Sequence, residues 1–189
     1  MPDTFTPELK GLIYNIAVHN SEDAYKKLFG LFFNPLFRFS FCMLKSREPA
    51  EEVASDVMFR LWQNRAELLQ IENLQVYAFV IARNMSLNIL RNNSRARVIS
   101  LDEIKIELNL ESLSPEQILI NSQNRARLES TIQSLPTRCK LVFKLIKEEG
   151  LSYKEVAEIL SISPKTVDAH LVTAMRKLSE ALKLKLDRA

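Results

Sequence analysis

The chain has 189 residues, enough for one medium-sized domain or two small ones. Hydrophobic residues make up 47% of it, which supports a packed core and argues against global disorder. The net charge is only +3, but an acidic middle segment separates two mildly basic ends, as expected for two nucleic-acid-facing lobes on an acidic tether. Ordinary charge fluctuation gives the same pattern, so charge alone does not establish the partner.

The composition predicts an all-α protein. There are only three Gly, and strand-like alternation is confined to residues 98–110. No segment has the ~20 uninterrupted apolar residues of a membrane helix, and the N-terminus lacks a signal-peptide pattern. Cys42 and Cys139 stand alone, and His19 and His170 have no partners at ligand spacing. We therefore expect a cytoplasmic protein with reduced cysteines, no bound metal and no direct membrane insertion.

The N-terminal half begins with two predicted helices. Ser21 is placed to cap a helix that starts at Glu22 and runs through AYKKLFGLFFNPLFRFSFCML. Its apolar residues cover more than half of the circumference, which predicts burial on several sides. A second helix is expected after Ser46, through EPAEEVASDVMFRLW, because Pro and acidic residues occupy its first turn.

A third helix is expected from residue 74 to about residue 91, with Asn73 as its cap and a loop before it. At 100° per residue, a polar and cationic stripe with one aromatic ring falls within about 40° of one direction: Tyr77, Asn84, Asn88, Arg91 and Arg95. Such a stripe fits an unstacked nucleic-acid strand, because stacking on an aromatic ring contributes ~1–3 kcal/mol per base. Alternatively, Tyr77 belongs to the core and the Asn side chains bond locally.

Two small helical domains joined by a linker are predicted. Residues 98–114 form the linker, because they are polar and carry no strong helical period. The N-terminal domain is then residues 1–97 and the C-terminal domain residues 115–189. In the latter, a Ser-Pro-Glu-Gln cap signal and two further helices are expected before Gly150.

The stretch SYKEVAEILSISPKTVDAHLVTAMRKL predicts two helices joined by a very short turn. Ser152 and Glu155 have the spacing of a capping box for the first helix. Ser163 is placed to cap the second, with Pro164 at its first position. Ser161 stands in the turn where Gly is frequent, so the turn must form without a positive φ or at a cost in stability.

The second of these helices has two faces. The expected inward face is apolar: Val167, Leu171, Ala174, Met175, Leu178 and Leu182. The other is small at its centre and polar or cationic at its edges, and it gives the DNA-binding candidates: Lys165, Thr166, Ala169, His170, Thr173, Arg176 and Lys177. Such a face can enter a major groove, which predicts a helix-turn-helix. The alternative is a solvated helical hairpin, and His170 either packs inward or touches the DNA backbone.

These residues resemble the sigma-seventy family of bacterial RNA polymerase sigma factors. LPTRCKLVFKLIKEEGLSYKEVAEILSISPKTVDAHLVTAMRKL resembles the C-terminal domain of that family. In the N-terminal half, AYKKLFGLFFNPLFRFSFCML, AEEVASDVMFRLW and VYAFVIARNMSLNILR resemble, in order, successive helices of the domain that engages polymerase and opens the promoter. With two such domains and a short linker, the resemblance is to the small extracytoplasmic-function (ECF) group.

The resemblance implies core RNA polymerase and promoter DNA as partners, with no cofactor and no small-molecule substrate. It assigns polymerase binding to the helix AEEVASDVMFRLW, and hence to Glu52, Asp56, Arg60 and Trp62, although Trp62 also fits a core position. The third helix and the loop before it would read and melt the minus-ten element, and the helix-turn-helix would bind the minus-thirty-five element. Many members are held inactive by an anti-sigma factor, which makes such a protein a candidate partner.

Two other functions remain open from the sequence. A stand-alone helix-turn-helix regulator would need a dimerising or ligand-sensing N-terminal half. A helical adaptor or anti-sigma factor would make no DNA contact, and the basic face of the last long helix argues against it. No Gly-rich phosphate loop, carboxylate pair or Ser/His/Asp constellation is recognisable, so we expect no enzymatic activity.

Overall fold

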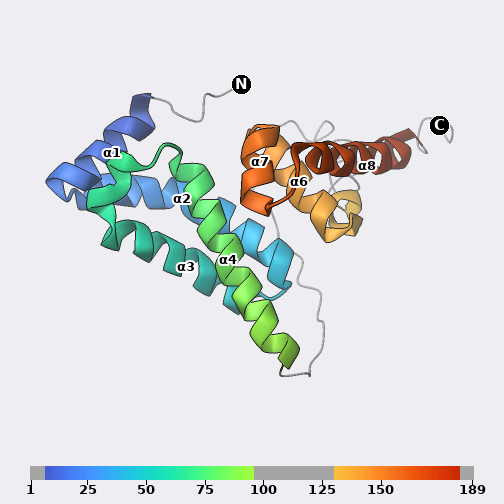
Figure 1. Cartoon of the computed structure of the whole chain (residues 1–189), viewed down its shortest axis with the longest axis horizontal. Coiled ribbons are helices and arrows are strands. Elements are labelled where there is room, and N and C mark those ends of the chain that lie inside the picture. Colours follow the sequence, from blue (N-terminus) through green and yellow to red (C-terminus); the bar gives the residue numbers. More distant parts are fainter. Residues whose placement is uncertain (1–6, 96–129, 184–189) are drawn as a thin grey trace, which may run out of the picture.

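The computed structural model describes residues 7–95 and 130–183, and both ranges are helical with no strand, which confirms the all-α class. For residues 93–95 and 181–183 the structure describes the backbone but not the side chains, and the predicted linker lies outside the described residues. Figure 1 shows the helices of the N-terminal range on one side and those of the C-terminal range on the other. We refer to these two helical groups as the N-terminal and C-terminal lobes.

The N-terminal lobe is built around one long helix. It contains, in chain order, α1 (Pro7–His19), α2 (Glu22–Leu44), α3 (Arg47–Gln63), the 3-10 helix η1 (Arg65–Gln70) and α4 (Leu74–Arg95). The Ser21 hydroxyl accepts a hydrogen bond from the Ala24 amide at 3.2 Å, so the predicted cap of α2 is confirmed. The helix expected after Ser46 begins there, but Ser46 makes no side-chain cap bond.

Helix α2 is the central helix of the lobe, and it packs against α1, α3 and α4. Its fully buried side chains include Leu28 and Leu36, and the Phe39 ring meets the Phe79 ring of α4 edge-on with centroids 5.2 Å apart. By length and composition α2 is also apolar enough to cross a membrane, which the sequence analysis did not anticipate. Its contacts on several sides are those of a core helix, for which the same composition is required.

The C-terminal lobe contains α6 (Thr137–Lys147), α7 (Tyr153–Leu160) and α8 (Pro164–Lys183), preceded by a helical segment at residues 130–134. The capping box of α7 is present: the Ser152 amide donates to Glu155 Oε2 at 2.7 Å, and the Glu155 amide donates to Ser152 Oγ at 3.3 Å. At the start of α8 the Thr166 amide donates to Ser163 Oγ at 3.1 Å. Both predicted helix starts are therefore confirmed.

The turn between α7 and α8 is closed by backbone bonds that use Ser161 in the left-handed region, with φ 50° and ψ 52°. The Ile162 amide donates to the Ala157 carbonyl at 3.0 Å, and the Ser161 amide donates to the Glu158 carbonyl at 3.2 Å. This is the Schellman pattern that ends many helices, usually with Gly at the left-handed position. The chain therefore makes the turn with a positive φ and a side chain in place.

The two lobes pack against each other, with α7 on α4 and α6 on α2 (Figure 1). Buried residues of both lobes belong to one continuous hydrophobic core. Polar contacts between described residues also cross the boundary: Asn73 Nδ2 donates to Glu155 Oε1 at 2.6 Å, Arg38 pairs with Glu149 at 3.3 Å, and Gln75 donates to the Glu149 carbonyl at 3.5 Å. We call this boundary the lobe interface.

Replacing Ser161 by Gly should raise the free energy of unfolding by about 0.5–1 kcal/mol. The left-handed conformation costs a residue with a Cβ roughly 1–2 kcal/mol, and Gly removes this cost. Part of the resulting stabilisation is offset, because Gly also gives the unfolded chain more conformational freedom. Urea denaturation measures the change.

The matched control is Ser163→Gly, a change of the same chemistry two residues away at a cap. In this control the free energy of unfolding should fall by a few tenths of a kcal/mol. A loss of stability in the Ser161→Gly variant would mean that the Ser161 side chain contributes more than its conformation costs.

Candidate nucleic-acid interface

The exposed face of helix α8 is rotated about the helix axis relative to the face that the sequence predicts. Four of the side chains predicted to point inward are buried: Val167, Leu171, Ala174 and Leu178. Met175 was placed wrongly, because it is 44% exposed. The reason is geometric: among the described elements α8 packs mainly on α6 and α7, and Met175 points about 70° away from the mean direction of the four buried side chains. The side chain of Leu182 lies outside the described residues.

The predicted DNA-binding residues of α8 divide into two groups. Lys165, Ala169 and Arg176 are exposed, whereas the others are half-buried: Thr166, His170, Thr173 and Lys177. Between the exposed three lies Val172, which is 58% exposed and which the sequence analysis did not single out. The exposed face thus has a small and apolar centre with cations beside it. Apolar side chains contact thymine methyl groups in a major groove, so this face remains compatible with base reading.

Several half-buried candidates on α8 are already engaged within the lobe. The Thr173 hydroxyl donates to the Ala169 carbonyl at 2.8 Å, and the Thr166 hydroxyl lies 2.8 Å from that of Ser163. His170 Nδ1 lies 3.6 Å from Cys139 Sγ on α6. His170 therefore packs against the protein, and its contact with the DNA backbone stays a prediction.

The stripe predicted on α4 faces outward. Tyr77 is 37% exposed, and Asn84, Asn88 and Arg91 are also exposed, while the side chain of Arg95 lies outside the described residues. The opposite side of α4 is buried against the lobe, which gives the helix its orientation. Tyr77 therefore lies on the surface and not in the core. The local bonding foreseen for the Asn side chains occurs at Asn84, whose Oδ1 accepts from Arg83 at 3.2 Å.

The start of α4 is held by the predicted cap. Asn73 Oδ1 accepts a hydrogen bond from the Val76 amide at 3.1 Å, and the Asn73 carbonyl accepts from the Tyr77 amide at 3.0 Å. The loop expected before it is partly the helix η1, which packs against α1 and buries Leu68. Tyr77 thus sits one turn after a firmly fixed helix start.

The candidate polymerase-binding residues on α3 are split between surface and packing. Glu52, Asp56 and Arg60 are exposed. Trp62 is half-buried, and its ring lies 4.8 Å from the Tyr25 ring and 4.8 Å from the Arg65 guanidinium. Its contacts are therefore those of the core position that the sequence also allowed.

Sequence reasoning missed Phe59 on the outward face of α3. Phe59 is 57% exposed, although it is a large apolar side chain between Asp56 and Arg60. The signal was present in the sequence, because Glu52, Asp56 and Phe59 follow the spacing that places residues on one helix face. An exposed aromatic ring within a charged rim is the arrangement of an interface anchor.

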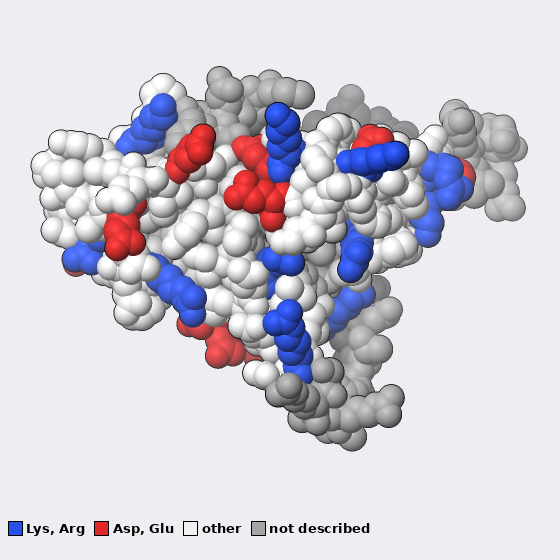
Figure 2. Space-filling model, viewed as in Figure 1, with Lys and Arg blue, Asp and Glu red and all other residues white. Residues whose placement is uncertain are grey.

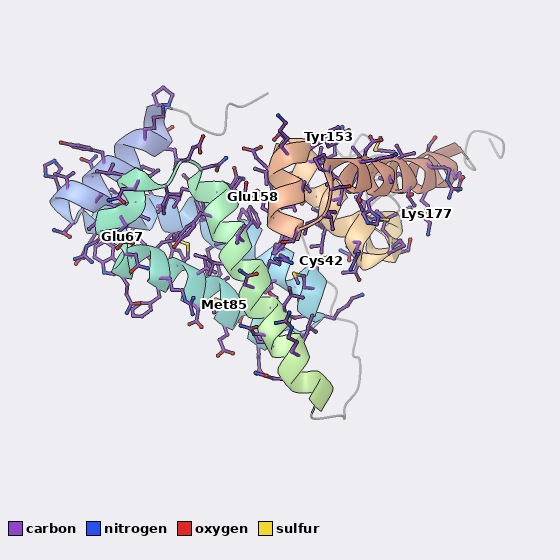
Figure 3. The ribbon with its side chains drawn as sticks, viewed as in Figure 1. Cys42, Glu67, Met85, Tyr153, Glu158 and Lys177 are labelled. Atoms are coloured by element: carbon purple, nitrogen blue, oxygen red, sulfur yellow. The ribbon has the colours of Figure 1, made fainter. Side chains whose placement is uncertain are left out.

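Charge is distributed unevenly over the face shown in Figure 2. Basic side chains lie over the C-terminal lobe and near the far end of α4, whereas acidic ones gather where α7 meets the start of α4. Figure 3 places Glu158 at this meeting point and Lys177 on the far side of the C-terminal lobe. The described residues contain no group of three His, Cys, Asp or Glu side chains that could hold a metal ion.

Comparison with known proteins gives two family matches in the expected order. The family described as "Sigma-70 region 2" matches residues 28–96, which run from α2 to the end of α4. The family described as "Sigma-70, region 4" matches residues 125–178, which include α6, α7 and most of α8.

Curated relatives are sigma factors. The ECF RNA polymerase sigma factor SigE of Mycolicibacterium smegmatis is 24% identical over 147 residues, which cover 78% of this chain and 57% of that protein. The RNA polymerase sigma-H factor of Pseudomonas aeruginosa is 30% identical over 69 residues, which cover 36% of each. The chain therefore spans little more than half of the first relative.

Two solved structures share the fold. One is the sigma factor RpoE in complex with the anti-sigma factor NepR from Bartonella quintana, with a TM-score of 0.62, 21% identity, and coverage of 84% of this chain and 96% of that one. The other is CnrH in complex with the cytosolic domain of CnrY, with a TM-score of 0.54, 19% identity, and coverage of 96% and 99%.

The fold and the exposed faces define a two-lobed helical protein with a helix-turn-helix in its second lobe. The region 2 match covers the first lobe from within α2 onward, and the region 4 match covers most of the second lobe. The chain belongs to the sigma-70 family of RNA polymerase sigma factors, in its ECF group, and the resemblance seen in the sequence is confirmed.

Proposed function

We propose that this chain binds core RNA polymerase and directs it to particular promoters. The observation that carries the proposal is that regions 2 and 4 occur in order on two lobes, and that each lobe exposes a polar or cationic helix face. In the proposal, residues 1–97 bind polymerase and read and melt the minus-ten element. Residues 98–114 link the lobes, and residues 115–189 bind the minus-thirty-five element.

Two weak contacts on one chain are sufficient for this task. Once one lobe is bound, the tether holds the other at a high effective concentration near its own site, so neither lobe needs high affinity alone. The phosphate contacts of α8 and α4 would make both steps dependent on salt. We assign no catalytic step to the chain, because nucleotide addition belongs to the polymerase, and we place it in the cytoplasm with that enzyme.

An anti-sigma factor is among the proposed partners. Both fold neighbours were solved with a second protein, one named as an anti-sigma factor and the other as the cytosolic domain of CnrY. Their identity to this chain is 21% and 19%, so they support the proposal only through a shared fold.

The deciding experiment is run-off transcription with purified core polymerase and a randomised promoter library. We expect defined start sites that depend on the added chain. Analytical ultracentrifugation should show one chain per polymerase, whereas a stand-alone regulator would bind an isolated operator as a dimer. If start sites are the same with and without the chain, the proposed function is wrong.

Replacing Phe59 by Ala should weaken binding to core polymerase by about tenfold or more, because buried aromatic anchors carry most of the affinity of many interfaces. Since the ring is largely exposed in the free chain, the free energy of unfolding should change by less than about 0.5 kcal/mol. Fluorescence anisotropy with labelled core enzyme measures the affinity.

Tyr14→Ala on α1 is the matched control for Phe59, because Tyr14 is 51% exposed and α1 packs on α2 and η1. This control should leave polymerase affinity unchanged. Equal effects of the two substitutions would show that Phe59 is not an interface anchor.

Arg176→Ala should lower the affinity of the chain for a minus-thirty-five duplex chosen from the library. Losing one phosphate contact should also reduce the log–log salt slope by about 0.9. Polymerase affinity should stay the same. A salt titration of duplex binding provides both quantities.

Glu180→Ala is the control for the Arg176 variant. Arg176 pairs with Glu180 at 2.9 Å, and both side chains are largely exposed, so loss of the pair itself should cost little. Because this control removes the same ion pair but keeps the cation, DNA binding should be unchanged or stronger. Parallel losses in both variants would assign the effect to the ion pair and not to a DNA contact.

A further inference from the structure

Helix α8 carries one exposed carboxylate that is not paired within the described structure. The described side chains of α8 include two acids, Asp168 and Glu180, and both are exposed. Glu180 pairs with Arg176 at 2.9 Å. Asp168 makes no hydrogen bond or ion pair with any described residue, although Lys165 lies one turn before it on the same helix. The contacts of the described lobe therefore leave the Asp168 carboxylate free for a partner outside the protein.

Asp168 lies beside the face of α8 that is proposed to read DNA. Helix α8 begins at Pro164, so Asp168 is in its second turn, and the N-terminal residues of a recognition helix are those that contact base edges. At 100° per residue, Asp168 points about 40° from Val172 and about 60° from Lys165. Lys177, labelled in Figure 3, points about 180° away from Asp168. The acid therefore occupies one flank of the exposed face, and this cation occupies the other.

A carboxylate on a DNA-reading face acts against binding unless a base compensates for it. Both strands that border a groove carry one negative charge per phosphate, so a buried or half-buried carboxylate is repelled by almost every sequence. A repulsive group of this kind gives specificity, because it lowers the affinity for wrong sequences more than for the right one. The unpaired Asp168 carboxylate is such a group, since the described structure offers it no cation in compensation.

One base has a major-groove edge that suits a carboxylate. Cytosine presents its N4 amino group there as a donor and no acceptor. Adenine presents the N6 amino group but also the N7 acceptor, which would face the second carboxylate oxygen. Guanine presents two acceptors, and thymine presents an acceptor and a methyl group, so both repel or exclude the charge. A carboxylate at this place therefore selects cytosine over the other three bases.

We propose that Asp168 is a specificity-determining residue of α8, which accepts a hydrogen bond from the N4 amino group of one cytosine in the upstream element. The inference rests on the proposed function, because it assumes that α8 lies in the major groove of that element. It adds the identity of one base and the residue that selects it. Val172, one turn further on, is placed to contact a neighbouring base pair, so the two preferences fall at different positions.

Asp168→Asn in the full-length chain tests the proposal with core polymerase and a promoter library randomised in the upstream element. The wild-type chain should enrich cytosine at one position by about 5- to 150-fold over guanine or thymine. Asn offers a donor and an acceptor, the combination that matches adenine N7 and N6. The variant should therefore change the preference at that position from cytosine to adenine and leave the other positions unchanged.

A second measurement uses an unrelated duplex, to which the full-length Asp168→Asn chain should bind about two- to fivefold more tightly than wild type. The gain is expected because the substitution removes a charge that the phosphates repel. Fluorescence anisotropy with labelled duplex measures it. A merely structural role of Asp168 would weaken binding to every duplex instead. Circular dichroism should show unchanged helix content, and the affinity for core polymerase should also stay the same.

A modified base tests the single hydrogen bond. N4-methylcytosine still pairs with guanine, and its methyl group then lies in the major groove in place of the hydrogen that Asp168 would accept. At the selected position it should lower the affinity of the wild-type chain by about fivefold or more. In Asp168→Ala, which has no acceptor there, the same methyl group should change the affinity by less than about twofold.

Glu180→Gln is the matched control, because it removes the same charge from the same helix three turns later. Glu180 is exposed and pairs with Arg176, so the control also tests whether any loss of a carboxylate changes base preference. The cytosine preference should be the same in this variant as in the wild-type chain.

The outcomes separate this inference from the proposed function. A switch to adenine in Asp168→Asn, together with the loss caused by N4-methylcytosine in the wild-type chain, supports the role of Asp168. The role is overturned if the wild-type chain selects an upstream sequence whose base preferences are unchanged in Asp168→Asn, or if Glu180→Gln changes them equally. If the wild-type chain enriches no upstream sequence at all, the proposed function is wrong and this inference is overturned with it.

Discussion

The first amides of a helix have no partner within the helix, and this constraint organises much of the protein. Ser21, Ser152 and Ser163 meet the requirement within their own segments. Asn73 also meets it locally, but its remaining amide group reaches the carboxylate that caps a helix of the other lobe. Helix capping thereby also produces a long-range contact, because the Asn73 amide and the Glu155 carboxylate each have two polar atoms and use one for a cap and the other for the contact between lobes.

Local signals were sufficient to predict most helix starts and the outward stripe of α4. Caps depend on spacings of three residues, and the stripe of Tyr77, Asn84 and Asn88 depends on the helical period, so both are visible in the sequence. The helix α1 was not predicted. The lobe interface was also not predictable, because it is formed by residues such as Arg38 and Glu149 that lie 111 positions apart.

The face of α8 shows where helical periodicity is insufficient. The pattern correctly identified an apolar side, but Met175 lies at its edge, and only the positions of α6 and α7 determine which edge is covered. The same reason explains Val172, which is apolar yet lies at the centre of the exposed side. A correct period thus gives two faces but leaves their boundary uncertain by about one residue, and for a DNA-reading helix that boundary decides which side chains reach the bases.

The packing of the lobes leaves the two candidate DNA-binding faces unequally exposed. Helix α8 packs on α6 and α7, and its side with Lys165, Val172 and Arg176 is exposed. At the start of α4, Asn73 and Gln75 make hydrogen bonds to the C-terminal lobe. Tyr77, Asn84 and Asn88 lie further along the same helix and are exposed. The lobe interface therefore takes up only the beginning of the predicted α4 stripe, because the helical period that points these three side chains outward continues past the residues that the second lobe contacts.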